Sequence, residues 1–111
     1  MNRQEVIDRL VEHREELEAQ GIKSLALFGS VVRGDATPSS DVDILVDLNR
    51  SMSLFGLSDL KHRLEQILGV QKVDLITREG IHPALKDLIL EEAVSVMGQG
   101  IHHQVRKNST D

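Results

Sequence analysis

Residues 28–46 decide the fold, and they read Phe-Gly-Ser-Val-Val-Arg-Gly-Asp-Ala-Thr-Pro-Ser-Ser-Asp-Val-Asp-Ile-Leu-Val. A Gly-Ser turn at Gly29 and Ser30 ends a short apolar run, and ten residues then separate Ser30 from an Asp-Val-Asp triplet. From residue 41 onward, side chains of opposite character alternate, which is typical of a half-buried strand. Asp41 and Asp43 therefore leave the same face of this strand, with their Cα atoms about 6–7 Å apart.

Helical and strand patterns alternate along the rest of the chain. The helices show apolar residues at helical spacing, and the strands show short apolar or alternating runs. The expected elements are a helix over residues 3–20, a central strand over 24–28, a short helical turn over 30–34, a strand over 41–48, a helix over 54–68, a strand over 70–76, a helix from Pro83 and an edge strand over 93–97. This order predicts an α/β (α+β) domain with a small mixed sheet of three to four strands flanked by helices.

Residues 1–97 are expected to form one domain, since single domains commonly have about 100–150 residues. In its last helix, Ala84, Leu85, Leu88 and Ile89 are expected to face the core. Residues 98–111 show no apolar period and are expected to be a disordered tail.

The composition excludes several function classes. The net charge is −5, and aromatic residues make up only 2% of the chain, so no direct binding of nucleic acid is expected. The absence of cysteine excludes disulfides, thiolate metal sites and a cysteine nucleophile. The charged start does not resemble a signal peptide, and no apolar run approaches the roughly 18–20 residues of a membrane span, so a cytoplasmic protein is expected.

The acidic triplet is the candidate centre of chemistry. Mg²⁺ takes oxygen ligands, and it prefers one or two carboxylates together with substrate phosphate and water. Asp41 and Asp43 could therefore hold one or two ions against a nucleotide triphosphate, although such a pair can also be solvated charges at a strand edge. Asp74 lies on the opposite face of its strand from Val73, and it joins the same cluster if the two strands are neighbours.

The turn before the triplet offers partners for phosphate. Backbone N–H groups at Gly29 and Ser30 and the Ser30 hydroxyl could bind an anion, and Arg33 could clamp a phosphate. The alternatives are a helix N-cap for Ser30 and a surface arginine for Arg33.

Together these residues resemble a known family. Gly29 and Ser30, ten intervening residues and then Asp41-Val42-Asp43 are similar to the signature of minimal nucleotidyltransferases, which belong to the DNA polymerase β-like superfamily. The resemblance covers about residues 3–97 and implies a polymerase β-like nucleotidyltransferase core.

The resemblance also implies roles for these residues. Asp41, Asp43 and Asp74 would bind metal and carry catalysis, with Asp74 helping to activate the acceptor hydroxyl. Two Mg²⁺ ions would act as cofactors and ATP as substrate. Gly29, Ser30 and Arg33 would bind the nucleotide.

The resemblance further implies a partner. Larger relatives carry a helical lobe where this chain ends, so a separate chain is expected to supply the acceptor, in a hetero-oligomer or a homo-oligomer. Minimal nucleotidyltransferases commonly pair with a helical HEPN-domain toxin, and the antitoxin would transfer AMP from ATP to a toxin tyrosine. Two alternatives stay open: an antitoxin that acts by occlusion without catalysis, and a homodimer that adenylylates a small molecule.

Overall fold

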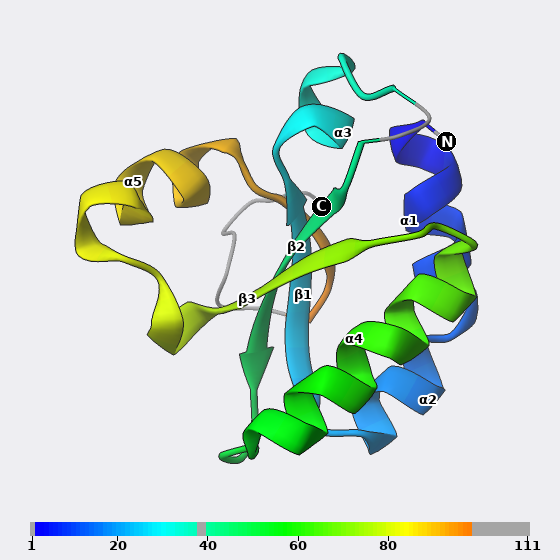
Figure 1. The fold of residues 1–111 in the computed structure, drawn as a ribbon, viewed down its shortest axis with the longest axis vertical. Helices are drawn as coiled ribbons and strands as arrows, with labels where there is room; N and C mark the ends of the chain where they lie inside the picture. Colours follow the sequence, from blue (N-terminus) through cyan, green and yellow to red (C-terminus); the bar gives the residue numbers. More distant parts are fainter. Residues whose placement is uncertain (1, 38–39, 99–111) are drawn as a thin grey trace, which may run out of the picture.

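A computed structural model describes residues 2–37 and 40–98 (Figure 1). The chain forms α1 (Arg3–Glu12), α2 (Arg14–Ala19), β1 (Ile22–Phe28), α3 (Ser30–Arg33), β2 (Val42–Leu48), α4 (Leu54–Leu68), β3 (Val73–Thr77), the 3-10 helix η1 (Arg78–Gly80), α5 (Pro83–Glu92) and β4 (Val94–Met97). In the described part of the chain, no helix combines the length and the apolar composition that crossing a membrane requires. The expected tail lies outside the described residues except for Gly98.

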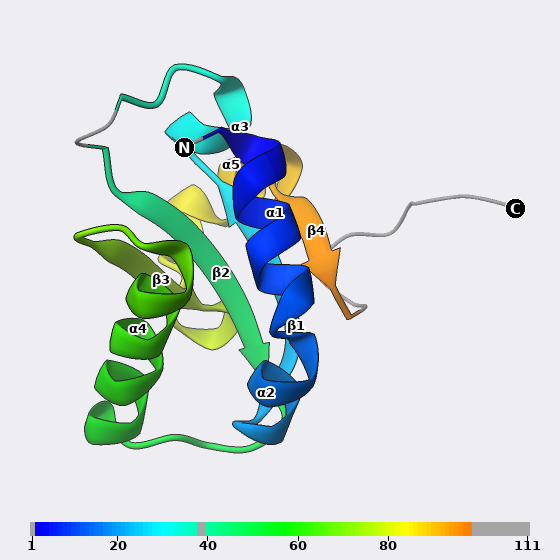
Figure 2. The same ribbon diagram turned by 90° about the vertical axis from the view of Figure 1, so that its right-hand side faces the viewer.

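The strands form one mixed sheet, as predicted. Their order is β3-β2-β1-β4, so β1 and β2 are central. β1 runs antiparallel to both β2 and β4, whereas β2 and β3 are parallel and are connected through α4. In Figure 2, α1, α2 and α4 lie in front of the strands and α5 lies behind them. Among the described elements, α1, α2 and α4 therefore cover one face of the sheet, and α5 lies on the other.

Alternation along β2 divides the core between the two faces. Val42, Ile44 and Val46 are buried in the larger cluster, which they share with residues of α1 and α4. Leu45 points the other way into a smaller cluster beside α5. The smaller cluster contains Ala26, Phe28, Leu45, Ile81, Ile89 and Ala93. Asp43 shares the face of Leu45, as the alternation predicted.

The first helix is shorter than predicted. It breaks at His13, whose φ of −105° and ψ of 18° are not helical. The His13 ring contacts the Arg9 carbonyl, with 2.9 Å between Nδ1 and the oxygen. The backbone N–H of His13 bonds to Leu10 at the same place. These local hydrogen bonds close α1 and let α2 begin in a new direction.

The third strand starts later than predicted, at Val73. Gly69 ends α4 in the left-handed region, as expected, with a φ of +69°. The N–H of Val70 then still bonds back to the Glu65 carbonyl, at 3.2 Å. Val70 is therefore tied to the cap of the helix and does not begin the strand.

The expected inward face of α5 is wrong for three of its four residues. Leu85 and Leu88 are 49% and 63% exposed, and Ala84 is also exposed, whereas Ile89 is buried. Figure 1 shows α5 lying to one side of the sheet, and its last turn carries the buried residue. The helical period was correct, but none of the described residues forms a second layer over its first two turns.

The packing of α4 predicts a large difference between two of its leucines. Leu64 is fully buried, and Leu54 is 83% exposed. We expect Leu64→Ala to lower the free energy of unfolding by about 2–5 kcal/mol. Leu54→Ala should change it by less than about 0.5 kcal/mol. Urea denaturation measures both, and equal losses would contradict this description of the core.

Candidate active site

Two of the predicted carboxylates meet through the parallel register of β2 and β3. Asp43 on β2 pairs with Asp74 on β3, and its other neighbour on the sheet is Phe28 at the end of β1. Asp41 lies one residue before β2. The expectation that Asp74 belongs to a strand beside the acidic triplet is therefore confirmed.

A glutamate of α4 fixes the strand that carries Asp74. The Oε2 atom of Glu65 accepts a hydrogen bond from the Val73 N–H at 2.9 Å. This bond is the largest cause that lowers the pKa of Glu65, and Lys61 adds to it. On the other side, the Val42 N–H donates to the Lys72 carbonyl at 3.2 Å. These bonds set the start of β3 against β2 and thereby place Asp74.

The carboxylate of Asp43 lies in an unfavourable electrostatic environment. Burial raises its pKa to about 6, and the neighbouring Asp74 and Asp41 carboxylates add to the shift. A bound cation would remove this repulsion, and carboxylate oxygens are the ligands that Mg²⁺ prefers. The donor chemistry of the pair therefore fits Mg²⁺.

Asp41 has a different partner from the other two. Its Oδ2 atom lies 3.5 Å from the Lys72 ammonium, so it forms an ion pair. Within residues 2–37 and 40–98, no three His, Cys, Asp or Glu side chains converge as a metal-ligand group. The structure thus brings Asp43 and Asp74 together and places Asp41 beside them, paired with a lysine.

The Gly-Ser turn lies directly against the carboxylates. Gly29 has a φ of +76° and a ψ of −153°, which favour glycine. A Cβ built at Gly29 would overlap the Asp43 carboxylate. Gly29 is the N-cap of α3 and Ser30 is its first helical residue, so the alternative of a helix N-cap for Ser30 is not what the structure shows. Its hydroxyl is half-buried beside the turn.

Glu92 is a site residue that the sequence analysis missed. Its Oε1 atom accepts from the Gly29 N–H at 2.6 Å, and its Oε2 atom accepts from Arg33 Nη1 at 2.9 Å. The guanidinium of Arg33 also lies 3.4 Å from Asp35. The sequence held one signal for Glu92. Glu91 and Glu92 end a helix, where negative charge is unfavourable, so a partner for one of these carboxylates could have been expected.

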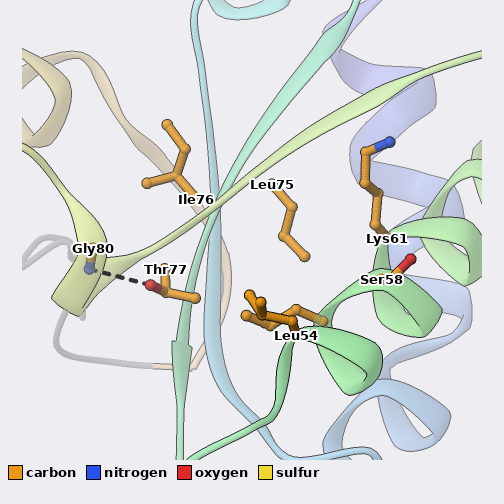
Figure 3. A pocket seen from close by; sticks show the side chains of 8 residues that line it. Leu54, Ser58, Lys61, Leu75, Ile76, Thr77 and Gly80 are labelled. Atoms are coloured by element: carbon orange, nitrogen blue, oxygen red, sulfur yellow. Dashed lines mark hydrogen bonds between the residues drawn. The ribbon is translucent and has the colours of Figure 1, made fainter.

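Two surface hollows lie beside these elements. One, of about 400 Å³, lies between the start of α4 and β3, and it is lined by Leu54, Leu57, Ser58, Lys61, Leu75, Ile76, Thr77 and Gly80. Figure 3 shows Leu75 and Ile76 leaving opposite sides of β3 there. The other, of about 720 Å³, lies between the start of α1 and α3 and includes Arg33. None of the three aspartates lines either hollow.

The sequence that forms this fold matches a known class of enzyme. Residues 7–96 match the family model described as "Nucleotidyltransferase domain". The sheet, its paired carboxylates and the Gly-Ser turn therefore lie within a nucleotidyltransferase domain.

Curated relatives are similar over most of the chain. The "Putative protein adenylyltransferase MJ0435" of Methanocaldococcus jannaschii is 47% identical over 77 residues, which are 69% of this chain and 82% of the relative. The "Protein adenylyltransferase MntA" of Thermococcus cleftensis is 38% identical over 94 residues, which are 84% and 94% of the two chains. This chain belongs to the nucleotidyltransferase domain family.

Solved structures share the fold. A chain described as "Structure of putative minimal nucleotidyltransferase" has a TM-score of 0.65 and 34% identity, and the match covers 85% of this chain and 95% of that one. A toxin-antitoxin chain solved with AMP-PNP has a TM-score of 0.66 at 21% identity, covering 89% and 75%. A chain from a tri-AMPylated Shewanella oneidensis HEPN toxin in complex with MNT antitoxin has a TM-score of 0.59 at 17% identity, covering 82% and 73%.

The raised pKa of Asp43 predicts that its charge destabilises the metal-free protein. Its pKa is about 6 in the folded state, against an ordinary value of 3.8, so the folded protein binds more protons between these values. The stability contributed by this group is therefore present at low pH and is lost as the pH rises through about 6. We expect Asp43→Asn to raise the free energy of unfolding near pH 7 by about 1 kcal/mol, after discounting for partial exposure.

Urea denaturation without divalent cations measures this effect at two pH values. Near pH 4 the gain should vanish, because the native carboxyl is then protonated. Asp59→Asn is the matched control, since Asp59 is exposed on α4. If Asp43→Asn is less stable than the native protein near pH 7, the claim that the ionised Asp43 carboxylate destabilises the metal-free protein is contradicted.

The close approach of Gly29 to Asp43 predicts that alanine is not tolerated there. Gly34→Ala is the matched control, because Gly34 also has a positive φ, +85°, but has no atom within 4 Å of a built Cβ. Backbone strain alone costs about 1–3 kcal/mol, so Gly34→Ala should lower the free energy of unfolding by that much. Gly29→Ala should lower it clearly more, because the new Cβ also overlaps the Asp43 carboxylate. Thermal unfolding measures the difference, and equal losses at the two glycines would refute the close contact.

Proposed function

We propose that this protein is a Mg²⁺-dependent protein adenylyltransferase that transfers AMP from ATP to a tyrosine hydroxyl of a helical HEPN-domain toxin. The observation that carries the proposal is the register that puts Asp43 beside Asp74 and against Gly29. This places acidic oxygens next to a turn that can receive phosphate.

In this proposal the carboxylates arrange the reaction. Asp41, Asp43 and Asp74 would hold Mg²⁺, and Asp41 would leave its ion pair with Lys72 to do so. The ion would supply positive charge that offsets negative charge on the departing pyrophosphate. The acceptor oxygen bonds to the α-phosphorus, and the bond from that phosphorus to the pyrophosphate oxygen breaks. Asp74 is exposed at the edge strand, and it takes the proton of the acceptor hydroxyl.

The turn and α3 hold the rest of the nucleotide. The Ser30 hydroxyl donates to a phosphate oxygen beside Gly29. Arg33 is 52% exposed at its side chain and offers a planar guanidinium to the same phosphates. Positioning and charge stabilisation then provide most of the rate enhancement, since phosphoryl chemistry needs little covalent help from the protein.

The relatives support AMP and a protein acceptor. The two curated relatives are named as protein adenylyltransferases, and one solved complex contains an AMPylated HEPN toxin. Another toxin-antitoxin structure was solved with AMP-PNP, an analogue of ATP. The net charge of −5 also favours a protein acceptor over nucleic acid.

A labelling assay tests the proposal. The chain is incubated with Mg²⁺, ATP labelled at the α-phosphate and a purified HEPN toxin. We expect label on the toxin, and we expect Asp41→Asn/Asp43→Asn to lower the rate at least about 100-fold, because charge stabilisation at the reacting group is lost. Asp74→Asn should also lower the rate, whereas Asp59→Asn should not.

Further arms separate the alternatives. Tyr→Phe substitutions in the toxin should remove the label. Equal labelling by the double variant would refute the mechanism. Inhibition of the toxin without ATP would instead support occlusion, and labelling of small molecules alone would support a homodimeric enzyme.

A further inference from the structure

We propose that Glu92 is a positioning residue for the nucleotide, which sets the Gly29–Ser30 turn and Arg33 in the arrangement that receives phosphate. The inference rests on the proposed nucleotide site and adds a residue to it. Glu92 lies at the end of α5, about sixty positions along the chain from the turn.

The register of the sheet brings Glu92 to the turn. β1 and β4 are antiparallel, with Leu27 opposite Val94. Two residues beyond this pair, Gly29 lies opposite Glu92. The Glu92 side chain bridges the gap between these two residues, because its Oε1 atom accepts from the Gly29 N–H at 2.6 Å. Strand register thus brings the end of α5 close to the turn, and the side chain completes the contact.

Glu92 and the acidic pair approach Gly29 from opposite sides. β1 lies between β4 and β2 in the sheet, and Glu92 comes from the side of β4. Asp43 contacts the position of the missing Cβ of Gly29 from β2. The N–H of Gly29 is therefore already used on the side away from Asp43 and Asp74. The Ser30 hydroxyl and Arg33 lie nearby and can donate to a phosphate.

The same carboxylate also fixes Arg33. Arg33 Nη1 donates to Glu92 Oε2 at 2.9 Å, while its Nε faces Asp35 at 3.4 Å. A guanidinium has five N–H donors in a fixed plane, so these two contacts set its orientation and leave the donors of Nη2 for a phosphate oxygen. One glutamate thereby connects both ends of α3, because Gly29 precedes the helix and Arg33 ends it.

Glu92 is itself held firmly. Its neighbours Ile89 and Ala93 are buried against the sheet, and its own side chain is only 23% exposed. The Gly29 N–H and then Arg33 lower the pKa of Glu92, so it stays ionised. A fixed, ionised carboxylate can organise the turn before nucleotide arrives, which reduces the ordering needed on binding.

A competing interpretation gives the opposite result. If Glu92 occupied the place of a phosphate, its removal would tighten nucleotide binding. If Glu92 positions the turn, its removal weakens binding. The direction of the change in affinity therefore decides between them.

The experiment compares Glu92→Ala, Glu92→Gln and the control Glu91→Gln. Glu91 is exposed on the same helix and carries the same charge. The dissociation constant of Mg²⁺–ATP is measured by calorimetry, and kcat and KM for ATP are measured by toxin labelling. We expect Glu92→Ala to raise both the dissociation constant and KM about tenfold, with a smaller change in kcat. Glu92→Gln should lie between alanine and the native residue, because its amide oxygen can still accept from Gly29.

The amide resonance of Gly29 provides a readout that does not depend on activity. It should shift in Glu92→Ala, shift less in Glu92→Gln and stay in place in Glu91→Gln, which separates loss of this bond from general unfolding. Native or tighter ATP binding by Glu92→Ala would overturn the inference, as would an unchanged Gly29 resonance. A native protein that binds ATP but leaves the toxin unlabelled would refute the proposed acceptor, and the binding and resonance data would still decide the role of Glu92.

Discussion

The parallel register between β2 and β3 is the constraint on which the rest of the site depends. It holds Asp43 beside Asp74 on adjacent strands, where partial burial and like charge raise the pKa of Asp43. A sheet selected for stability alone would avoid two such neighbours. The unfavourable pairing becomes useful when a cation binds, because the repulsion is then replaced by coordination.

The site extends as a row across the whole sheet. In sheet order, Glu92 precedes β4, Gly29 follows β1, Asp43 lies on β2 and Asp74 lies on β3. Each member contacts the next: Glu92 accepts the Gly29 N–H, Gly29 leaves room for the Asp43 carboxylate, and Asp43 pairs with Asp74. A change in register of any strand would therefore disturb both the acidic pair and the turn.

Local patterns predicted the elements well where the pattern and the environment agree. The alternation from Val42 to Val46 assigned side chains to the correct faces, and α4 has the predicted bounds, with Ser53 and Gly69 as its caps. The break at His13 was missed because it depends on a ring that bonds to a backbone carbonyl. The exposed leucines of α5 were also missed, since a helical period shows which residues share a face but not whether anything covers that face.

The sequence by itself determined the Gly-Ser turn, the common face of Asp41 and Asp43, and the outward face of Asp74, because these follow from chain spacing and the two-residue period of a strand. Only the tertiary structure decided that Asp43 is adjacent to Asp74, that Asp41 pairs with Lys72 and that Glu92 reaches Gly29 and Arg33. The physical reason is that these contacts join residues on different strands and helices. Their geometry is fixed by strand order and register, which no local pattern in the chain specifies.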